Sequence, residues 1–151
     1  MTYYTFIGQC PFCDYKDEGV IVYKDDECFA VISADPINKY HVLVIPKKHY
    51  EQFVDLPDAL ASHIFLVAKE ISRVVRGVCN ADAISHVSDD DVSKSGYNLV
   101  KHYKFHIIPR FKEDIDTVNW EALRTQADEK TRAQYAEEIK RRLVSYQTLN
   151  V

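Results

Sequence analysis

Short hydrophobic runs along the first two-thirds of the chain predict β-strands. Residues 20–24 and 27–33 have the pattern of a β-hairpin, with Asp25-Asp26 as the turn. Residues 41–46 form a continuous apolar run typical of a buried strand, and residues 83–88 and 99–108 predict two further strands. Residues 1–18 show neither strand nor helix periodicity.

A helical pattern divides the predicted strands. Asp58 is placed to cap a helix that continues to about residue 78, with an apolar stripe made of Leu60, Ile64, Val67, Ile71, Val74, Val75 and Val78. After Trp120 the chain becomes charged and helical, most clearly over residues 131–145, where Tyr135, Ile139 and Leu143 recur every four positions. The pattern predicts an α+β fold: an antiparallel β-sheet with one long central helix and a C-terminal helix.

Composition fits one domain, residues 1–151, with a core at about 10–110 and a helical extension at about 118–147. The net charge of −4 gives no basic surface, so we expect no nucleic-acid partner. We find no secretory signal and no apolar run near the roughly 20 residues that span a membrane. We therefore expect a cytoplasmic protein that does not bind membranes, whose four cysteines are thiols or metal ligands.

The segment from Lys101 to Arg110 carries the most distinctive chemistry. On a strand, alternate residues share a face, which groups His102, Lys104 and His106. A strand face with two imidazoles and a lysine ammonium between them is typical neither of a buried core nor of a surface that only faces solvent. The segment resembles the signature of the histidine triad (HIT) superfamily, His-x-His-x-His followed by two apolar residues and often Pro-Arg, with Lys104 in place of the middle histidine. The resemblance runs from about Cys10 to Arg110.

A second group of residues has ligand chemistry. Cys10 and Cys13 have the spacing of two thiolates on one metal, although a redox pair or two buried thiols would give the same spacing. Residues 40–49 match the HIT pattern G-H-V-L-V-I-P-K-x-H at all but the first position. In zinc-containing members of that family, the matching ligands would be Cys10, Cys13, His49 and His102. The resemblance thus implies a closed, structural zinc site that holds the N-terminal segment.

Other cysteines and histidines have simpler interpretations. Cys28 and Cys79 lie in apolar segments and are expected to be core residues. His41 begins an apolar strand and is interpreted as a structural, hydrogen-bonding histidine.

Lys104 changes the reaction that the resemblance implies. In active HIT proteins, the middle imidazole attacks the α-phosphorus of a nucleotide, and the third histidine, here His106, lies near the leaving group. A lysine has an unperturbed pKa of about 10.4 and is a cation at pH 7. We favour phosphate binding with reduced or altered turnover. The alternatives are an active hydrolase or nucleotidyltransferase that uses Lys104 or His106, and a Lys104 that only reaches solvent.

The resemblance also assigns a nucleotide site. Asn98 stands at the position of a phosphate-contacting glutamine, and Ser33 at the position of a ribose-binding aspartate. Phe12, Val31 and Ile32 are candidates for the base pocket, although each residue type is more often simply core. The implied ligand is a purine nucleotide or nucleoside phosphate derivative, of the phosphoramidate or dinucleoside polyphosphate class, and the implied assembly is a homodimer. A zinc-stabilised interaction domain that binds no nucleotide is the alternative from another class.

Overall fold

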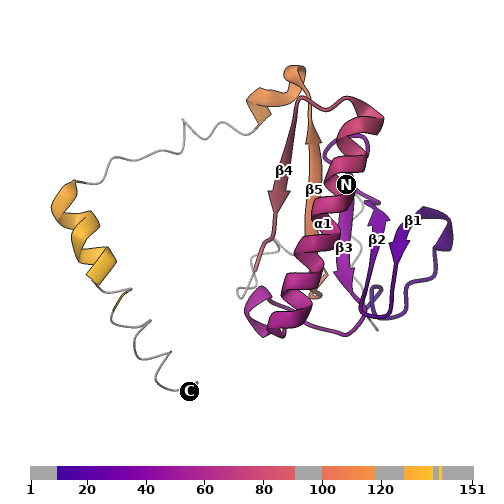
Figure 1. The fold of residues 1–151 in the computed structure, drawn as a ribbon, viewed down its shortest axis with the longest axis horizontal. Coiled ribbons are helices and arrows are strands. Elements are labelled where there is room, and N and C mark those ends of the chain that lie inside the picture. The colour runs from indigo at the N-terminus through magenta and orange to yellow at the C-terminus, as the bar shows by residue number, and fades with distance from the viewer. Residues whose placement is uncertain (1–9, 91–99, 118–127, 138–139, 141–151) are drawn as a thin grey trace. The chain divides into compact units, whose positions relative to one another are not determined.

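A five-stranded antiparallel sheet forms the centre of the fold. The computed structural model describes residues 10–90, 100–117, 128–137 and 140. The strand order is β1-β2-β3-β5-β4, and every neighbouring pair is antiparallel (Figure 1). The strands are β1 (Ile21–Lys24), β2 (Cys28–Ile32), β3 (Val42–Pro46), β4 (Ala83–Val87) and β5 (Phe105–Arg110). The predicted antiparallel α+β fold is confirmed.

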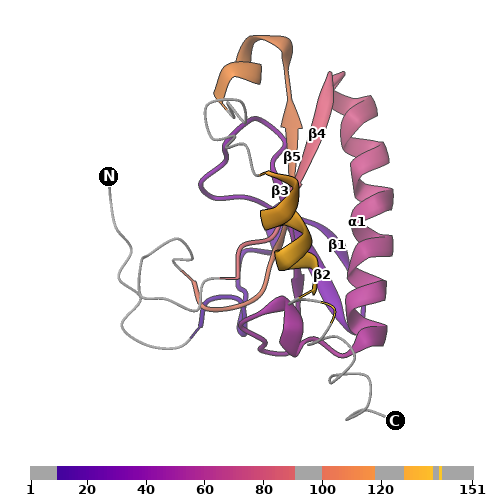
Figure 2. The ribbon, with the colours of Figure 1, turned by 90° about the vertical axis from the view of Figure 1, so that its left-hand side faces the viewer.

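One long helix, α1 (Asp58–Cys79), runs along one face of the sheet (Figures 1 and 2). It buries five residues against that face: Leu60, Ile64, Val67, Ala68 and Val75. The predicted stripe was wrong at its outer edge, because Val74 and Val78 are 63% and 60% exposed. The predicted cap at Asp58 was also wrong, since Pro57 occupies the N-cap position without a side-chain hydrogen bond.

The start and end of α1 have other causes. Asp58 is the first helical residue, where its charge favours the positive end of the helix dipole. The helix stops at Asn80, which has a φ of 51°, the left-handed conformation that commonly ends helices. Short 3₁₀ turns cover Glu18–Val20, Phe53–Asp55 and Lys112–Thr117.

The two faces of the sheet bury different side chains. The face toward α1 takes Ala30, Val44 and Ile107 into the main core. On the other face, Phe29, Val31, Leu43 and Ile45 form a second buried cluster. Since strand residues alternate between faces, the register pairs Val31 with Leu43 and Leu43 with His106, which puts these three side chains in one row on the face away from α1.

The motif strand is shorter than predicted. Strand β5 begins at Phe105, so His102 and Lys104 precede it, and Leu99 lies outside the described residues. The backbone hydrogen bonds explain the difference, because the His102 N–H bonds the Val100 carbonyl at 2.8 Å and the Tyr103 N–H bonds the Tyr50 carbonyl at 2.6 Å, outside the ladder.

The β1–β2 turn is built around Asp25. Its Oδ1 accepts the backbone N–H groups of Glu27 and Cys28, both at 2.8 Å, and its Oδ2 lies 2.6 Å from the Tyr23 hydroxyl and from His63 Nε2 on α1. Burial alone would raise the pKa of Asp25, but these hydrogen bonds hold it well below its ordinary value. The turn is therefore fastened to the helix by a charged group.

The chain divides into two compact units, Met1–Ile115 and Asp116–Val151. In the second unit, residues 129–137 are helical, and Asp128 caps them by accepting the Thr131 N–H and Thr131 hydroxyl, each at 2.9 Å. Tyr135 of the predicted stripe is exposed, whereas Ile139 and Leu143 lie outside the described residues. None of the described helices is long and apolar enough to cross a membrane.

Candidate metal centre and phosphate-binding residues

Four ligand atoms from three separate segments converge beside the sheet. The Sγ atoms of Cys10 and Cys13 and one ring nitrogen each of His49 and His102 all lie within 4.8 Å of one another. The chain reaches this arrangement because His102 precedes β5 and His49 follows β3, and these ends of two neighbouring antiparallel strands adjoin. The cysteines come from a tight turn closed by the Cys13 N–H bonding to the Cys10 carbonyl at 3.2 Å.

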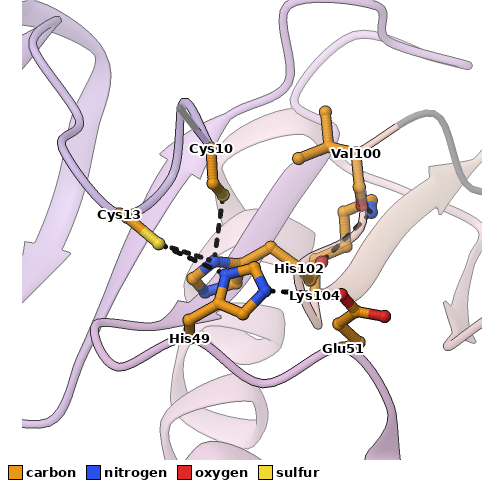
Figure 3. A network of polar contacts seen from close by, with 7 residues as sticks. All are labelled: Cys10, Cys13, His49, Glu51, Val100, His102 and Lys104. Atoms are coloured by element: carbon orange, nitrogen blue, oxygen red, sulfur yellow. Dashed lines mark hydrogen bonds and ion pairs between the residues drawn. The ribbon is translucent and has the colours of Figure 1, made fainter. Parts of the chain in front are cut away.

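The spacing of these atoms fits a tetrahedral zinc ion. Cys10 Sγ lies 3.3 Å from His102 Nδ1, Cys13 Sγ lies 3.3 Å from His49 Nδ1, and Cys13 Sγ lies 3.7 Å from His102 Nδ1 (Figure 3). With Zn–S and Zn–N bonds of about 2.3 and 2.05 Å, a tetrahedral angle places sulfur and nitrogen about 3.6 Å apart. Two thiolates and two imidazoles leave no open position.

The tautomer of His102 also favours metal binding. His102 Nε2 lies 2.8 Å from the Pro46 carbonyl oxygen, which can only accept, so this nitrogen carries the proton and Nδ1 offers its lone pair to the thiols. The second nitrogen of His49 faces Glu51, at 3.7 Å. A partner on the far ring nitrogen is the usual way in which metal-ligating histidines are oriented.

Lys104 is half-buried and its ammonium bonds to backbone. Its Nζ donates to the Val100 carbonyl at 3.0 Å and to the His102 carbonyl at 3.3 Å (Figure 3). Burial lowers the pKa of Lys104 to about 8, while the charges of Asp89 and Cys10 oppose that change. At pH 7 such a group is still roughly nine-tenths protonated. Lys104 is therefore a cation at pH 7.

His106 is paired with His41, and a backbone amide orients the pair. The Ile37 N–H donates to His41 Nδ1 at 3.1 Å, so the proton of neutral His41 lies on Nε2. That nitrogen lies 2.9 Å from His106 Nδ1 and donates to it, which leaves the His106 proton on Nε2. Burial lowers the pKa of His106 to about 4, and repulsion from Lys104 and from His41 in its protonated form adds to the decrease. Neutral His106 is thus a hydrogen-bond donor through Nε2.

The sequence prediction recognised His41 as a hydrogen-bonding residue but not its connection to His106. The position of His41 in the sequence could have indicated this connection, because His41 directly precedes β3, the strand that pairs with β5.

The structure brings together some of the predicted nucleotide residues. Val31 shares a sheet face with His106, and Phe12 packs against the same cluster as Val31. Ile32 does not join them, because it packs against the core that faces α1. Ser33 is half-buried at the end of β2, with its N–H bonded to the His41 carbonyl at 2.8 Å. Asn98 lies outside the described residues.

Comparison with known proteins gives the family. Residues 16–113 match the model of the HIT domain. The chain belongs to the HIT family. A crystal structure of a HIT family member from Bacillus subtilis has a TM-score of 0.77 at 25% identity, covering 89% of this chain and 97% of that one.

Two further solved structures bear on the site. A Zn-bound histidine triad family protein from Mycobacterium smegmatis is 28% identical, with a TM-score of 0.61, over 71% of this chain and 78% of that one. A hypothetical histidine triad nucleotide-binding protein from Sulfolobus tokodaii is 26% identical, with a TM-score of 0.61, over 68% and 70% of the two chains. This HIT chain is thus similar to one relative described as Zn-bound and one described as nucleotide-binding.

Proposed function

We propose that this HIT protein binds a purine nucleotide or nucleoside phosphate derivative and has reduced or altered nucleotidyl-transfer activity. The observation that carries the proposal is the pair of polar groups on the motif segment. The cationic Lys104 replaces a neutral nucleophile, and His106 is held as a donor by His41. A cation and an N–H donor stabilise a phosphate anion, but neither presents a lone pair for attack on phosphorus.

A structural zinc is the second part of the proposal. Cys10, Cys13, His49 and His102 would hold the ion, and its role would be to pin the N-terminal segment to the sheet. The geometry of these four residues and the Zn-bound relative support it. We expect a reducing compartment such as the cytoplasm, since both thiols must stay reduced to bind metal.

The third part is a homodimer. On α1, Leu66, Val74 and Val78 are each more than half exposed, and the neighbouring Gly77 has open space where a Cβ would lie. A glycine inside a helix costs up to about 1 kcal/mol relative to alanine, and an unpartnered apolar stripe is typical of an interface. Light scattering of the purified protein tests this part, because a monomeric mass over the micromolar range would contradict it.

The central test is turnover of an adenosine phosphoramidate by the parent protein, beside Lys104→His and Lys104→Ala. We expect an inactive or weakly active parent and a gain of activity in Lys104→His, because an imidazole is substantially neutral at pH 7. Activity in the parent that Lys104→Ala abolishes would instead establish lysine catalysis.

Thermal stabilisation by AMP tests nucleotide binding separately, since a ligand that binds only the native state must raise its stability. Absence of any shift at millimolar AMP would favour a zinc-stabilised interaction domain. A variant outside the proposed nucleotide site, Glu70→Gln on the exposed surface of α1, is the control for both assays.

A further inference from the structure

Phe12 lies between the metal cluster and the nucleotide site proposed above. It lies between the two cysteines of the turn, and its ring makes an edge contact with the ring of His102, with centroids 5.8 Å apart at 86°. The Nζ of Lys104 lies 5.9 Å from the centroid of the same ring. One aromatic side chain therefore lies beside a histidine of the metal cluster and beside the ammonium of Lys104.

The position of Phe12 depends on the cysteine turn. The thiols of Cys10 and Cys13 contact His49 and His102, and an ion pair of 2.6 Å joins Asp14 to the nearby Lys16. The rings of Phe12 and Tyr15 add apolar contacts with the sheet. A metal bound by both thiols would replace weak sulfur contacts by bonds and would remove most of the freedom of this turn.

We infer that zinc at this cluster sets the affinity of the proposed nucleotide site by fixing Phe12, so that zinc and nucleotide bind cooperatively. Phe12 is then a positioning residue, which acts through the orientation of one wall of the site. The inference rests on the proposed function, because it requires that the protein binds a nucleotide beside Lys104. If zinc already orders Phe12, nucleotide binding loses less conformational entropy and its free energy becomes more favourable.

Thermodynamic linkage makes the coupling between zinc and nucleotide reciprocal, so it can be measured from the binding of either ligand. If zinc raises the affinity for nucleotide by some factor, nucleotide raises the affinity for zinc by the same factor. Couplings of this kind usually amount to about 5- to 150-fold, and we expect at least about fivefold because one ring contacts both sites.

The experiment uses the zinc-loaded full chain and a chromogenic chelator. The apparent zinc affinity is measured by competition with and without AMP, after AMP binding to the same sample has been established by calorimetry. We expect AMP to tighten zinc binding about fivefold or more. Direct chelation of zinc by AMP would have the opposite sign, since it would draw metal from the protein.

Phe12→Leu tests the assigned route. This variant keeps both cysteines, so we expect it to retain one zinc per chain while the effect of AMP on zinc affinity disappears. Phe65→Leu, a matched change of a half-exposed ring on α1, should leave the coupling unchanged.

The possible outcomes separate the two proposals. If AMP binds but leaves zinc affinity unchanged, the inference is overturned while nucleotide binding stands. Coupling that persists in Phe12→Leu would overturn the role of Phe12. If AMP does not bind the zinc-loaded protein, the proposed function fails and the inference fails with it.

Discussion

Substitution of Cys13 by serine should separate the contribution of metal from that of packing. The Cys13 side chain is exposed, so removing its thiol leaves no cavity. Exposed substitutions without special contacts usually change stability by no more than about 0.5 kcal/mol. Any larger loss must come from the metal site, where a hydroxyl is a much poorer zinc ligand than a thiolate.

The expected loss is large. A metal present at about 1,000 times its dissociation constant stabilises the native state by about 4 kcal/mol. For a chain of this size, 1 kcal/mol corresponds to a change in Tm of roughly 2–4 °C. We therefore expect Cys13→Ser to lower the Tm by about 8–16 °C and to reduce the zinc content from one equivalent per chain to nearly none.

The assay combines thermal unfolding, with and without a strong chelator, and elemental analysis of the purified protein. Chelator should lower the Tm of the parent to about that of Cys13→Ser and should have little effect on the variant. Cys79→Ser is the control, because that thiol bonds the Val75 carbonyl at 3.1 Å and lies outside the cluster. A Cys13→Ser protein that keeps a full equivalent of zinc, or a parent indifferent to chelator, would refute the reasoning.

Three further predictions concern single contacts. Tyr40 has a φ of 63°, where glycine is favoured, so Tyr40→Gly should stabilise the fold by about 0.5–1 kcal/mol in denaturant unfolding; a destabilised variant would contradict this. The pKa of His106 is depressed to about 4, so neutral His106 should contribute fully to stability above about pH 6.5 and progressively less as the pH falls toward 4. NMR should show that the His106 ring stays neutral through that range. A titration of this ring near pH 6.5 would contradict the prediction. Asp25→Asn should lower the free energy of unfolding by about 1–2 kcal/mol at pH 7, because it weakens charge-assisted hydrogen bonds such as that to His63. The variant should also lose less stability than the parent below pH 4, where the Asp25 carboxylate of the parent becomes protonated. An unchanged dependence of stability on pH in this range would contradict the role of the Asp25 carboxylate.

The sequence by itself determined the order and kind of the elements. The predicted strand at residues 41–46 and the helix at residues 58–78 differ from β3 and α1 by one residue at one end. This agreement has a local cause, since the repeat of apolar positions records the backbone period of each element. The resemblance of the motif segment to the HIT signature likewise identified the family, which the comparisons confirm.

Only the tertiary structure decided how distant residues meet. The strand pattern extended through His102 and Lys104, but the Tyr103 N–H bonds the Tyr50 carbonyl and the His102 ring bonds the Pro46 carbonyl, and this segment lies outside the ladder. The pairing of His41 with His106 likewise depends on the register of β3 against β5. Such contacts join segments more than 50 residues apart, and a local pattern contains no information about strand register.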